Sequence, residues 1–268
     1  MTYTKKAFFY FVTALMISCS PQIQRDLKKG RSLAEQGLFS DSMSYFEKVL
    51  IRSEGGPEGL LAAKEASKIA LYDLKASDKA IKFLKFLVMN SKDNQERINS
   101  QKQISEIYFE QLNDYKSSIV EINRLLTMLS DPTEKAKYKM DIARAYYYQN
   151  NFFQAESEVD EFLRGDIPAQ QKFDMTVLKG NILIAQKKMT DAADLLLKLL
   201  EKYPEIARRE NIELTLSVIY EEQKDYKNAI LMLEKLKGHH PMPEYVELRI
   251  KKLVDRQKNL PGAKGFKK

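Results

Sequence analysis

The stretch Gly37-Leu38-Phe39-Ser40-Asp41-Ser42-Met43-Ser44-Tyr45-Phe46 contains a pattern that returns five more times along the 268-residue chain. The pattern consists of a turn-like segment, a small residue and an apolar run. The small residue recurs at intervals of 37 or 38 residues, at Ser42, Ala80, Ser118, Ala155, Ala192 and Ala229. A fixed period of this length indicates a chain built from stacked copies of one structural unit.

Each small residue is followed by two large side chains, four and seven residues downstream. These pairs are Phe46 and Val49, Leu84 and Leu87, Ile122 and Leu125, Val159 and Phe162, Leu196 and Leu199, and Leu233 and Leu236. Spacings of three and four residues place them on one face of a helix. An aromatic residue or methionine also stands three residues upstream in five of the six copies, at Phe39, Tyr115, Phe152, Met189 and Tyr226, with Ser77 as the exception.

The units resemble the tetratricopeptide repeat, a helix-turn-helix unit of about 34 residues. The phrases that carry the resemblance are residues 37–46, 113–119 and 225–230, together with the closing prolines Pro204 and Pro241. The glycine of the first helix stands at Gly30 and Gly180, and the copies that depart from it carry Lys68, Glu106, Ala143 and Ser217. The resemblance implies an all-α, helix-turn-helix solenoid of about six repeats over residues 25–258.

Residues 243–258 are expected to form a helix that caps the last repeat, because a stacked unit cannot bury its apolar face alone. The apolar stripe of this helix is predicted at Tyr245, Val246, Leu248, Leu253 and Val254, and the residues facing water at Arg249, Lys251, Lys252 and Arg256. Asn259-Leu260-Pro261-Gly262 ends the helix, and residues 259–268 are predicted to be a short basic tail.

The N-terminus has the three zones of a secretory signal. Lys5 and Lys6 precede an apolar run over residues 7–17, which leads to Ser18 and Cys19. This run is about half as long as the ~20 residues that a membrane-spanning helix needs. A cleaved signal peptide over residues 1–18 is therefore predicted.

Residues 15–19, Leu-Met-Ile-Ser-Cys, resemble the lipobox of bacterial lipoproteins, with Met16 where leucine is usual and Ile17 where a smaller residue is usual. The resemblance implies that Cys19, the single cysteine of the chain, is acylated and anchors the protein through a short linker over residues 19–24. Ser20, which is not aspartate, points to the periplasmic face of the outer membrane. The alternative is that Cys19 is an ordinary apolar residue at the end of a plain signal or short anchor.

Composition excludes several classes of protein. With 44% hydrophobic and 30% charged residues, the chain is neither disordered nor a multi-span membrane protein. The 44 lysines and arginines exceed the 37 acidic residues only mildly, and they are spread along the chain. No basic patch with interleaved aromatic residues occurs, so nucleic acid is not an expected partner.

Residues suited to catalysis or metal binding are sparse. The two histidines, His239 and His240, are adjacent in a loop and lack neighbours at zinc-ligand spacing, so a solvated connection is favoured over a metal site. Carboxylates such as Glu106 and Glu110 lie four residues apart, which is typical of a solvated helix face. We expect no enzyme activity, no cofactor, no metal and no small-molecule substrate.

A binding surface is the remaining expectation. In tetratricopeptide proteins the first helix of each unit lines a groove for a protein or an extended peptide, and a few of its positions face the ligand. Transfer of those positions gives the principal candidates Tyr72, Gln103, Glu110, Arg144, Tyr147, Tyr148, Asn181 and Ile184. The same transfer marks Asp73, Ile107, Gln111, Asn211, Glu221 and Glu222.

The run Tyr146-Tyr147-Tyr148 is the most suggestive part of this surface, because three consecutive helical residues cannot all be buried on one stripe. Tyr146 occupies a core position, which leaves Tyr147 and Tyr148 beside Arg144. Tyrosine and arginine are enriched at binding hot spots. The alternative is that these rings only cover the seam between neighbouring units.

The sequence thus favours a membrane-anchored periplasmic scaffold that binds a protein or extended peptide. Its plan is similar to that of repeat lipoproteins of outer-membrane protein assembly and of secretin pilotins. The alternative is an accessory lipoprotein that recruits or activates a cell-wall enzyme.

Overall fold

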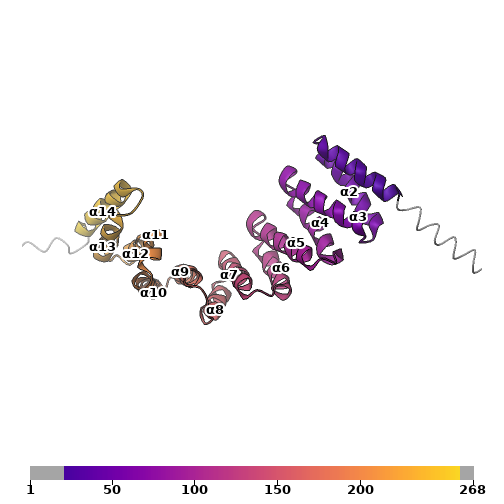
Figure 1. The fold of residues 1–268 in the computed structure, drawn as a ribbon. Coiled ribbons are helices and arrows are strands. Elements are labelled where there is room, and N and C mark those ends of the chain that lie inside the picture. Colours follow the sequence, from indigo (N-terminus) through magenta and orange to yellow (C-terminus); the bar gives the residue numbers. More distant parts are fainter. Residues whose placement is uncertain (1–20, 260–268) are drawn as a thin grey trace, which may run out of the picture. The chain divides into compact units, whose positions relative to one another are not determined.

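The computed structural model describes residues 21–259, and every regular element in this range is a helix (Figure 1). The order is a helix over residues 21–35, then α2 (Phe39–Ser53), α3 (Pro57–Lys68), η1 (Ile69–Asp73), α4 (Ser77–Asn90), α5 (Asn94–Glu106), η2 (Ile107–Gln111), α6 (Tyr115–Met128), α7 (Pro132–Tyr148), α8 (Phe152–Leu163), α9 (Ala169–Ala185), α10 (Met189–Lys202), α11 (Pro204–Arg209), α12 (Ile212–Glu222), α13 (Tyr226–Lys237) and α14 (Pro243–Lys258).

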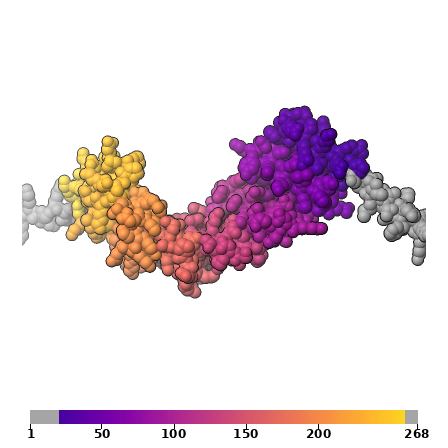
Figure 2. Space-filling view, viewed as in Figure 1, coloured from indigo at the N-terminus to yellow at the C-terminus, as the bar shows by residue number. Residues whose placement is uncertain are grey.

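The helices form two compact units, divided between Asp131 and Pro132. In the described part of the first unit the pairs are the helix over residues 21–35 with α2, α3–η1 with α4, and α5–η2 with α6. In the second unit they are α7 with α8, α9 with α10, and α11–α12 with α13, followed by α14. Six pairs and a terminal helix confirm the predicted all-α array of repeats within residues 21–259, and Figure 2 shows the packed surface of these pairs.

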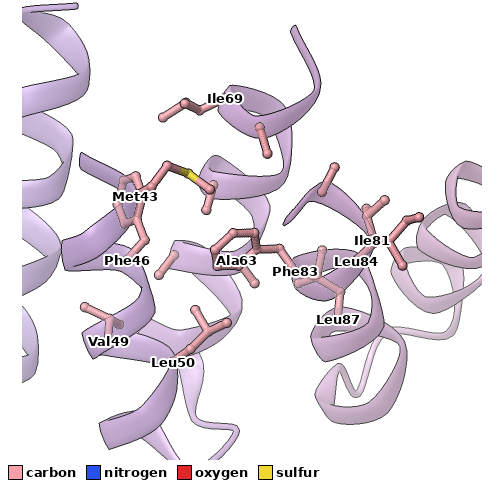
Figure 3. Close-up of a cluster of buried hydrophobic side chains, with 14 of the residues drawn as sticks. Met43, Phe46, Val49, Leu50, Ala63, Ile69, Ile81, Phe83, Leu84 and Leu87 are labelled. Atoms are coloured by element: carbon pink, nitrogen blue, oxygen red, sulfur yellow. The ribbon is translucent and has the colours of Figure 1, made fainter. Parts of the chain in front are cut away.

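The six small residues of the repeat all have no exposed surface: Ser42, Ala80, Ser118, Ala155, Ala192 and Ala229. The large residues four and seven positions downstream are buried as well. Figure 3 shows the ring of Phe83 on α4 directed toward the helix that carries Ala63. Small residues at the crossings let the helix pairs approach, and the large residues fill the space between units.

Close approach explains the glycines of the first helix. A Cβ atom added to Gly30 would lie 2.9 Å from Cε1 of Phe46, and one added to Gly180 would lie 3.0 Å from Cδ2 of Leu196. Both neighbours are the large residue four positions after the small one. In the first and fifth repeats, the absence of a side chain at the glycine therefore leaves the space that this large residue fills.

Two π-helical turns change the register of the second and third repeats. In η1 the N–H of Leu74 donates to the carbonyl of Ile69 at 3.0 Å, and in η2 the N–H of Leu112 donates to that of Ile107 at the same distance. A π-turn accommodates one extra residue in an α-helix. The insertion accounts for the two 38-residue intervals, whereas the later repeats keep an interval of 37.

This insertion corrects the predicted counterparts of Gly30. Lys68 and Glu106, which sequence spacing assigned to that position, are exposed, whereas Ser67 and Ser105 are buried. The hydrogen bonds show the same shift by one residue. Ser42 Oγ donates to the carbonyl of Gly30, twelve residues before it, at 2.7 Å, while Ser118 Oγ donates to that of Ser105, thirteen residues before it, at 3.3 Å.

The capping helix uses a narrower apolar face than predicted. Val246 and Leu253 of α14 are buried against the core that α13 contributes, and Ile250 packs partly against it. Tyr245 and Leu248, predicted to belong to the same stripe, are 42% and 51% exposed. Spacings of four and three residues keep positions 246, 250 and 253 on one face, and the helical turn carries 245 and 248 away from it.

The N-terminal helix begins earlier than predicted. Residues 21–24 are expected to belong to a linker, but they are already helical and form part of the helix described over residues 21–35. Cys19, the signal sequence and the tail from residue 260 onward lie outside the described residues. Within residues 21–259 no helix is both long and apolar enough to cross a membrane.

Candidate partner-binding site

Four of the predicted groove residues converge in one cavity of the second unit. Arg144, Tyr147 and Tyr148 from α7 and Asn181 from α9 line a cavity of about 330 Å³. The remaining lining residues come from α9, from α12 and from the residue before its N-cap: Phe173, Asp174, Val177, Leu178, Glu210, Ile212 and Thr215. The cavity therefore lies along the first helices of the fourth, fifth and sixth repeats.

The tyrosines form one wall of this cavity. The rings of Tyr147 and Tyr148 are 5.6 Å apart at 61°, and the ring of Tyr147 lies 5.9 Å from that of Phe152. Tyr148 is 51% exposed, while Tyr146 and Tyr147 pack partly against the core of the fourth repeat. Tyr147 thus both supports the core and lines the cavity, and Tyr148 offers the more accessible ring.

The floor is apolar and the rim is charged. Phe173, Leu178 and Ile212 are buried. Two charged residues also line the cavity. Arg144 Nη1 lies 3.2 Å from Oδ1 of Asp141, and Asp174 accepts a hydrogen bond from Gln170 Nε2 at 2.9 Å. An apolar side chain flanked by polar or charged groups matches this arrangement.

A second cavity, of about 290 Å³, lies in the first unit and contains Tyr72 and Gln103. Its lining comes from α3, η1, α4, the N-cap of α5 and α5 itself. Among these residues, Lys64 Nζ lies 3.4 Å from Oε1 of Glu96. The lining residues are Lys64, Ser67, Lys68, Leu71, Tyr72, Leu84, Leu87, Asp93, Gln95, Glu96, Asn99, Ser100 and Gln103. Tyr72, 69% exposed, is its most accessible aromatic ring.

Other predicted groove residues lie elsewhere. Ile107 is buried in the core of the first unit, which corrects its assignment to the groove. Ile184 packs partly against the core of the fifth and sixth repeats. Glu110 is exposed on η2 and lines neither cavity, and Gln111 Oε1 accepts a hydrogen bond from Ser77 Oγ at 2.8 Å. The π-turn of η2 displaces the third repeat from the family spacing used for the prediction.

The groove candidates of the last repeat, and Asp73 of the second, line neither of these two cavities. Glu221 lies 2.6 Å from Nη2 of Arg249 and also pairs with Arg256, so it holds the capping helix. Asp73 and Glu222 are exposed, Asn211 is the left-handed N-cap of α12, and none of the three lines either cavity.

Sequence reasoning missed the cavity floor. Phe173, Val177 and Leu178 occupy apolar helical positions that are indistinguishable from core positions by period alone. Ile212 and Thr215 were missed because the sixth unit begins with α11, a separate helix of six residues, before α12. No metal-binding group of three or more His, Cys, Asp or Glu occurs within residues 21–259.

Comparison with known families agrees with the fold. Residues 140–205 match the model of the tetratricopeptide repeat. The helix pairs within residues 21–259 therefore form an array of tetratricopeptide-like repeats, of which residues 140–205 match the family model. A comparison of its sequence with curated proteins gives no match.

Three solved structures illustrate the likeness, each at an identity that shows the fold alone. Naa15/Naa10 bound to HypK-THB is 14% identical, with a TM-score of 0.64 over 94% of this chain and 37% of the other. The apo form of RapI is 16% identical, with a TM-score of 0.59 over 88% and 72%. PilW, described as a widely conserved type IV pilus biogenesis factor, is 14% identical, with a TM-score of 0.52 over 85% and 98%.

Proposed function

We propose that this protein is an interaction scaffold that binds a protein or an extended peptide along the first helices of its repeats. The observation that supports this most directly is the convergence of Arg144, Tyr147, Tyr148 and Asn181 on one half-open cavity. The tyrosine and arginine side chains provide a large contact area with polar ends, which is the chemistry of binding hot spots. We expect no catalytic activity.

The proposal includes a lipid anchor at Cys19 and a location on the periplasmic face of the outer membrane. Its support is the sequence of residues 1–19 and the absence of other cysteines in the chain. More than one acyl chain on a cysteine gives stable membrane attachment. Because residue 21 already belongs to the first helix pair, such an anchor would hold the first repeat close to the lipid surface.

Within this class, a role in assembling outer-membrane proteins or secretins is the first candidate. The likeness of fold to PilW is compatible with it. The second candidate is an accessory lipoprotein that recruits or activates a cell-wall enzyme. Both use the same surface, so they differ in the partner that is captured.

The test is photo-crosslinking in cells from a benzophenone side chain at position 147. The matched control is Phe153 on α8, an aromatic residue of the same unit that is 77% exposed and does not line the cavity. Selective capture of an outer-membrane barrel or secretin subunit from position 147 supports the first candidate, and capture of a wall enzyme supports the second. Equal capture from positions 147 and 153 would contradict a binding role for the cavity.

A further inference from the structure

Two apolar side chains of the first unit are almost fully exposed at equivalent places of consecutive repeats. Ile51 on α2 is 79% exposed, and Met89 on α4 is 75% exposed. They are 38 residues apart, which is the interval between the first two repeats. Single exposed apolar side chains are common on protein surfaces, so the argument depends on where these two lie.

Contacts of the neighbouring residues place both side chains at the edge of the unit where the first helix begins. Arg52, near the end of α2, pairs with Asp26 of the helix over residues 21–35. A Cβ atom added to Gly55 would lie 2.5 Å from Oδ1 of Asn90, the last residue of α4. The residues that precede Arg52 and Asn90 are the two exposed apolar ones.

The buried side chains next to them show the same arrangement. In Figure 3, Leu50 of α2 and Leu87 of α4 lie at one side of the core cluster, and Ile69, at the end of the first helix of the second repeat, lies at the other. We call this side of the first unit the N-terminal edge, which comprises residues 21–25, 51–55 and 89–93.

The charges at the N-terminal edge are close to balance. Arg52 is neutralised by the buried carboxylate of Asp26. The other exposed charged residues there are two cations and two anions, Arg25, Lys92, Glu54 and Asp93. A surface that binds this edge therefore has to be attracted by the apolar side chains, since net charge contributes little.

The sequence supplies such a surface. Cys19, the proposed site of acylation, precedes Pro21 by two residues, and two residues span at most about 7 Å. A lipid on Cys19 is thus held at the same edge of the first unit as Ile51 and Met89.

We propose that the N-terminal edge rests on the lipid bilayer, with Ile51 and Met89 inserted at the boundary between headgroups and acyl chains. The proposal rests on the lipid anchor at Cys19 that is part of the proposed function. A short tether gives the edge an effective concentration on the order of millimolar at the lipid surface, so a contact too weak to recruit the protein alone is still formed. The contact orients the first unit, with the loops at residues 36–38 and 74–76 directed away from the bilayer.

The experiment uses the absence of tryptophan from the chain, which makes a single introduced tryptophan an unambiguous reporter. Ile51→Trp, Met89→Trp and Leu38→Trp are made in the full chain with its own signal sequence. The proteins are purified from membranes and incorporated into vesicles of phosphatidylethanolamine and phosphatidylglycerol with brominated acyl chains, which quench tryptophan that reaches them. We expect quenching at positions 51 and 89 to be several-fold stronger than at position 38.

Leu38 is the matched control because it is an exposed apolar residue at the opposite end of α2. It is 46% exposed and lies about 20 Å from Ile51 along the helix axis. Tryptophan itself favours the membrane interface, and the control carries the same preference. Equal quenching at positions 38 and 51, in protein that floats with the vesicles, would overturn the membrane contact and leave the anchor intact. Protein that does not float with the vesicles would contradict the lipid anchor and the contact together.

A second substitution tests whether the two side chains act together. Met89→Ser in the Ile51→Trp chain removes one apolar contact and should weaken quenching at position 51. Leu112→Ser in the same chain should not, because Leu112 follows η2 at the opposite end of the unit. Quenching that Met89→Ser leaves unchanged would overturn the role given to Met89.

Discussion

Glu221 on α12 accepts a hydrogen bond from Nη2 of Arg249 on α14 at 2.6 Å, and both side chains are about four-fifths buried. The carboxylate also pairs with Arg256, about two turns further along α14. Arg249 was expected to face water and Glu221 to face a partner. Their pairing shows that the terminal helix is held by an ionic contact as well as by its buried apolar face.

Replacement of Glu221 by glutamine should therefore loosen the cap. The change leaves two arginines without their carboxylate, one of them largely buried, and we expect a loss of about 1 to 2 kcal/mol in the free energy of unfolding. Chemical denaturation measures it, with Glu222→Gln as the control because Glu222 is exposed. Equal stability of the two variants would show that the ion pair contributes nothing.

Ala192→Leu should overpack the crossing of α9 and α10. Ala192 has no exposed surface, so a larger side chain must displace its neighbours, at a cost of about 1 to 3 kcal/mol. The matched control is Ala185→Leu at the exposed end of α9. Thermal unfolding compares the two, and a melting temperature lowered equally by both would contradict the repeat register.

The π-turn register has its own test in a pair of adjacent positions. Ser67→Leu should destabilise the first unit by about 1 to 3 kcal/mol, because Ser67 is buried where helix pairs approach. Lys68→Leu, at the exposed position that sequence spacing chose, should change stability by about 0.5 kcal/mol or less. A larger loss of stability in Lys68→Leu than in Ser67→Leu would contradict the π-turn register and support the one expected from sequence spacing.

Asp114 caps α6 and links its stability to pH. Its carboxylate accepts from the backbone N–H of Ser117 at 3.1 Å. A hydrogen bond from the side chain of Ser117, followed by this bond from its backbone N–H, lowers the pKa of Asp114. A carboxyl whose pKa is lower in the folded state stabilises the fold above its unfolded pKa and loses that contribution as pH falls through the folded pKa.

Asp114→Ala should thus cost about 1 kcal/mol at neutral pH. Asp114→Asn keeps an acceptor without a titrating charge, so the stability difference between wild type and this variant should shrink on acidification below about pH 4. Denaturation midpoints at pH 7 and pH 3 provide the measurement. A difference that grows on acidification would contradict the lowered pKa.

Cys19→Ser tests the anchor. We expect the variant to be released from membranes or to remain uncleaved, because serine cannot form the thioether that carries the lipid. Cell fractionation with metabolic fatty-acid labelling gives the answer, and the wild-type chain serves as the reference. Unchanged labelling of the variant would exclude lipidation at this residue.

Much of the architecture could be predicted from the chain alone. The positions from Ser42 to Ala229 and their apolar followers were assigned from spacing, and all of them are buried. The exceptions have local causes. The π-turns add one residue without any marked change in composition, so Lys68 and Glu106 were placed where Ser67 and Ser105 belong. Tyr245 and Leu248 look like core residues but lie on the outer side of the last helix.

The lining of the cavity in the second unit could be predicted in part, whereas its role in binding stays a prediction. Tyr147, Tyr148, Arg144 and Asn181 do share one cavity. Family spacing is accurate there because α7 and α9 contain no π-turn. Ile107 and Glu221 were assigned wrongly, since whether a helical residue faces a groove, a core or a neighbouring helix depends on what packs against it.

The sequence by itself determined that the chain is a series of amphipathic helix pairs. The spacing of small and large apolar residues within a few turns is enough to define the buried face of each helix. Only the tertiary structure decided which polar groups meet. Arg249 and Glu221, and His239 and Glu213, come from different helices and loops, and each pairing depends on the angle and distance at which those elements pack. A helical period specifies a face, whereas an interhelical contact requires the positions of two faces in space.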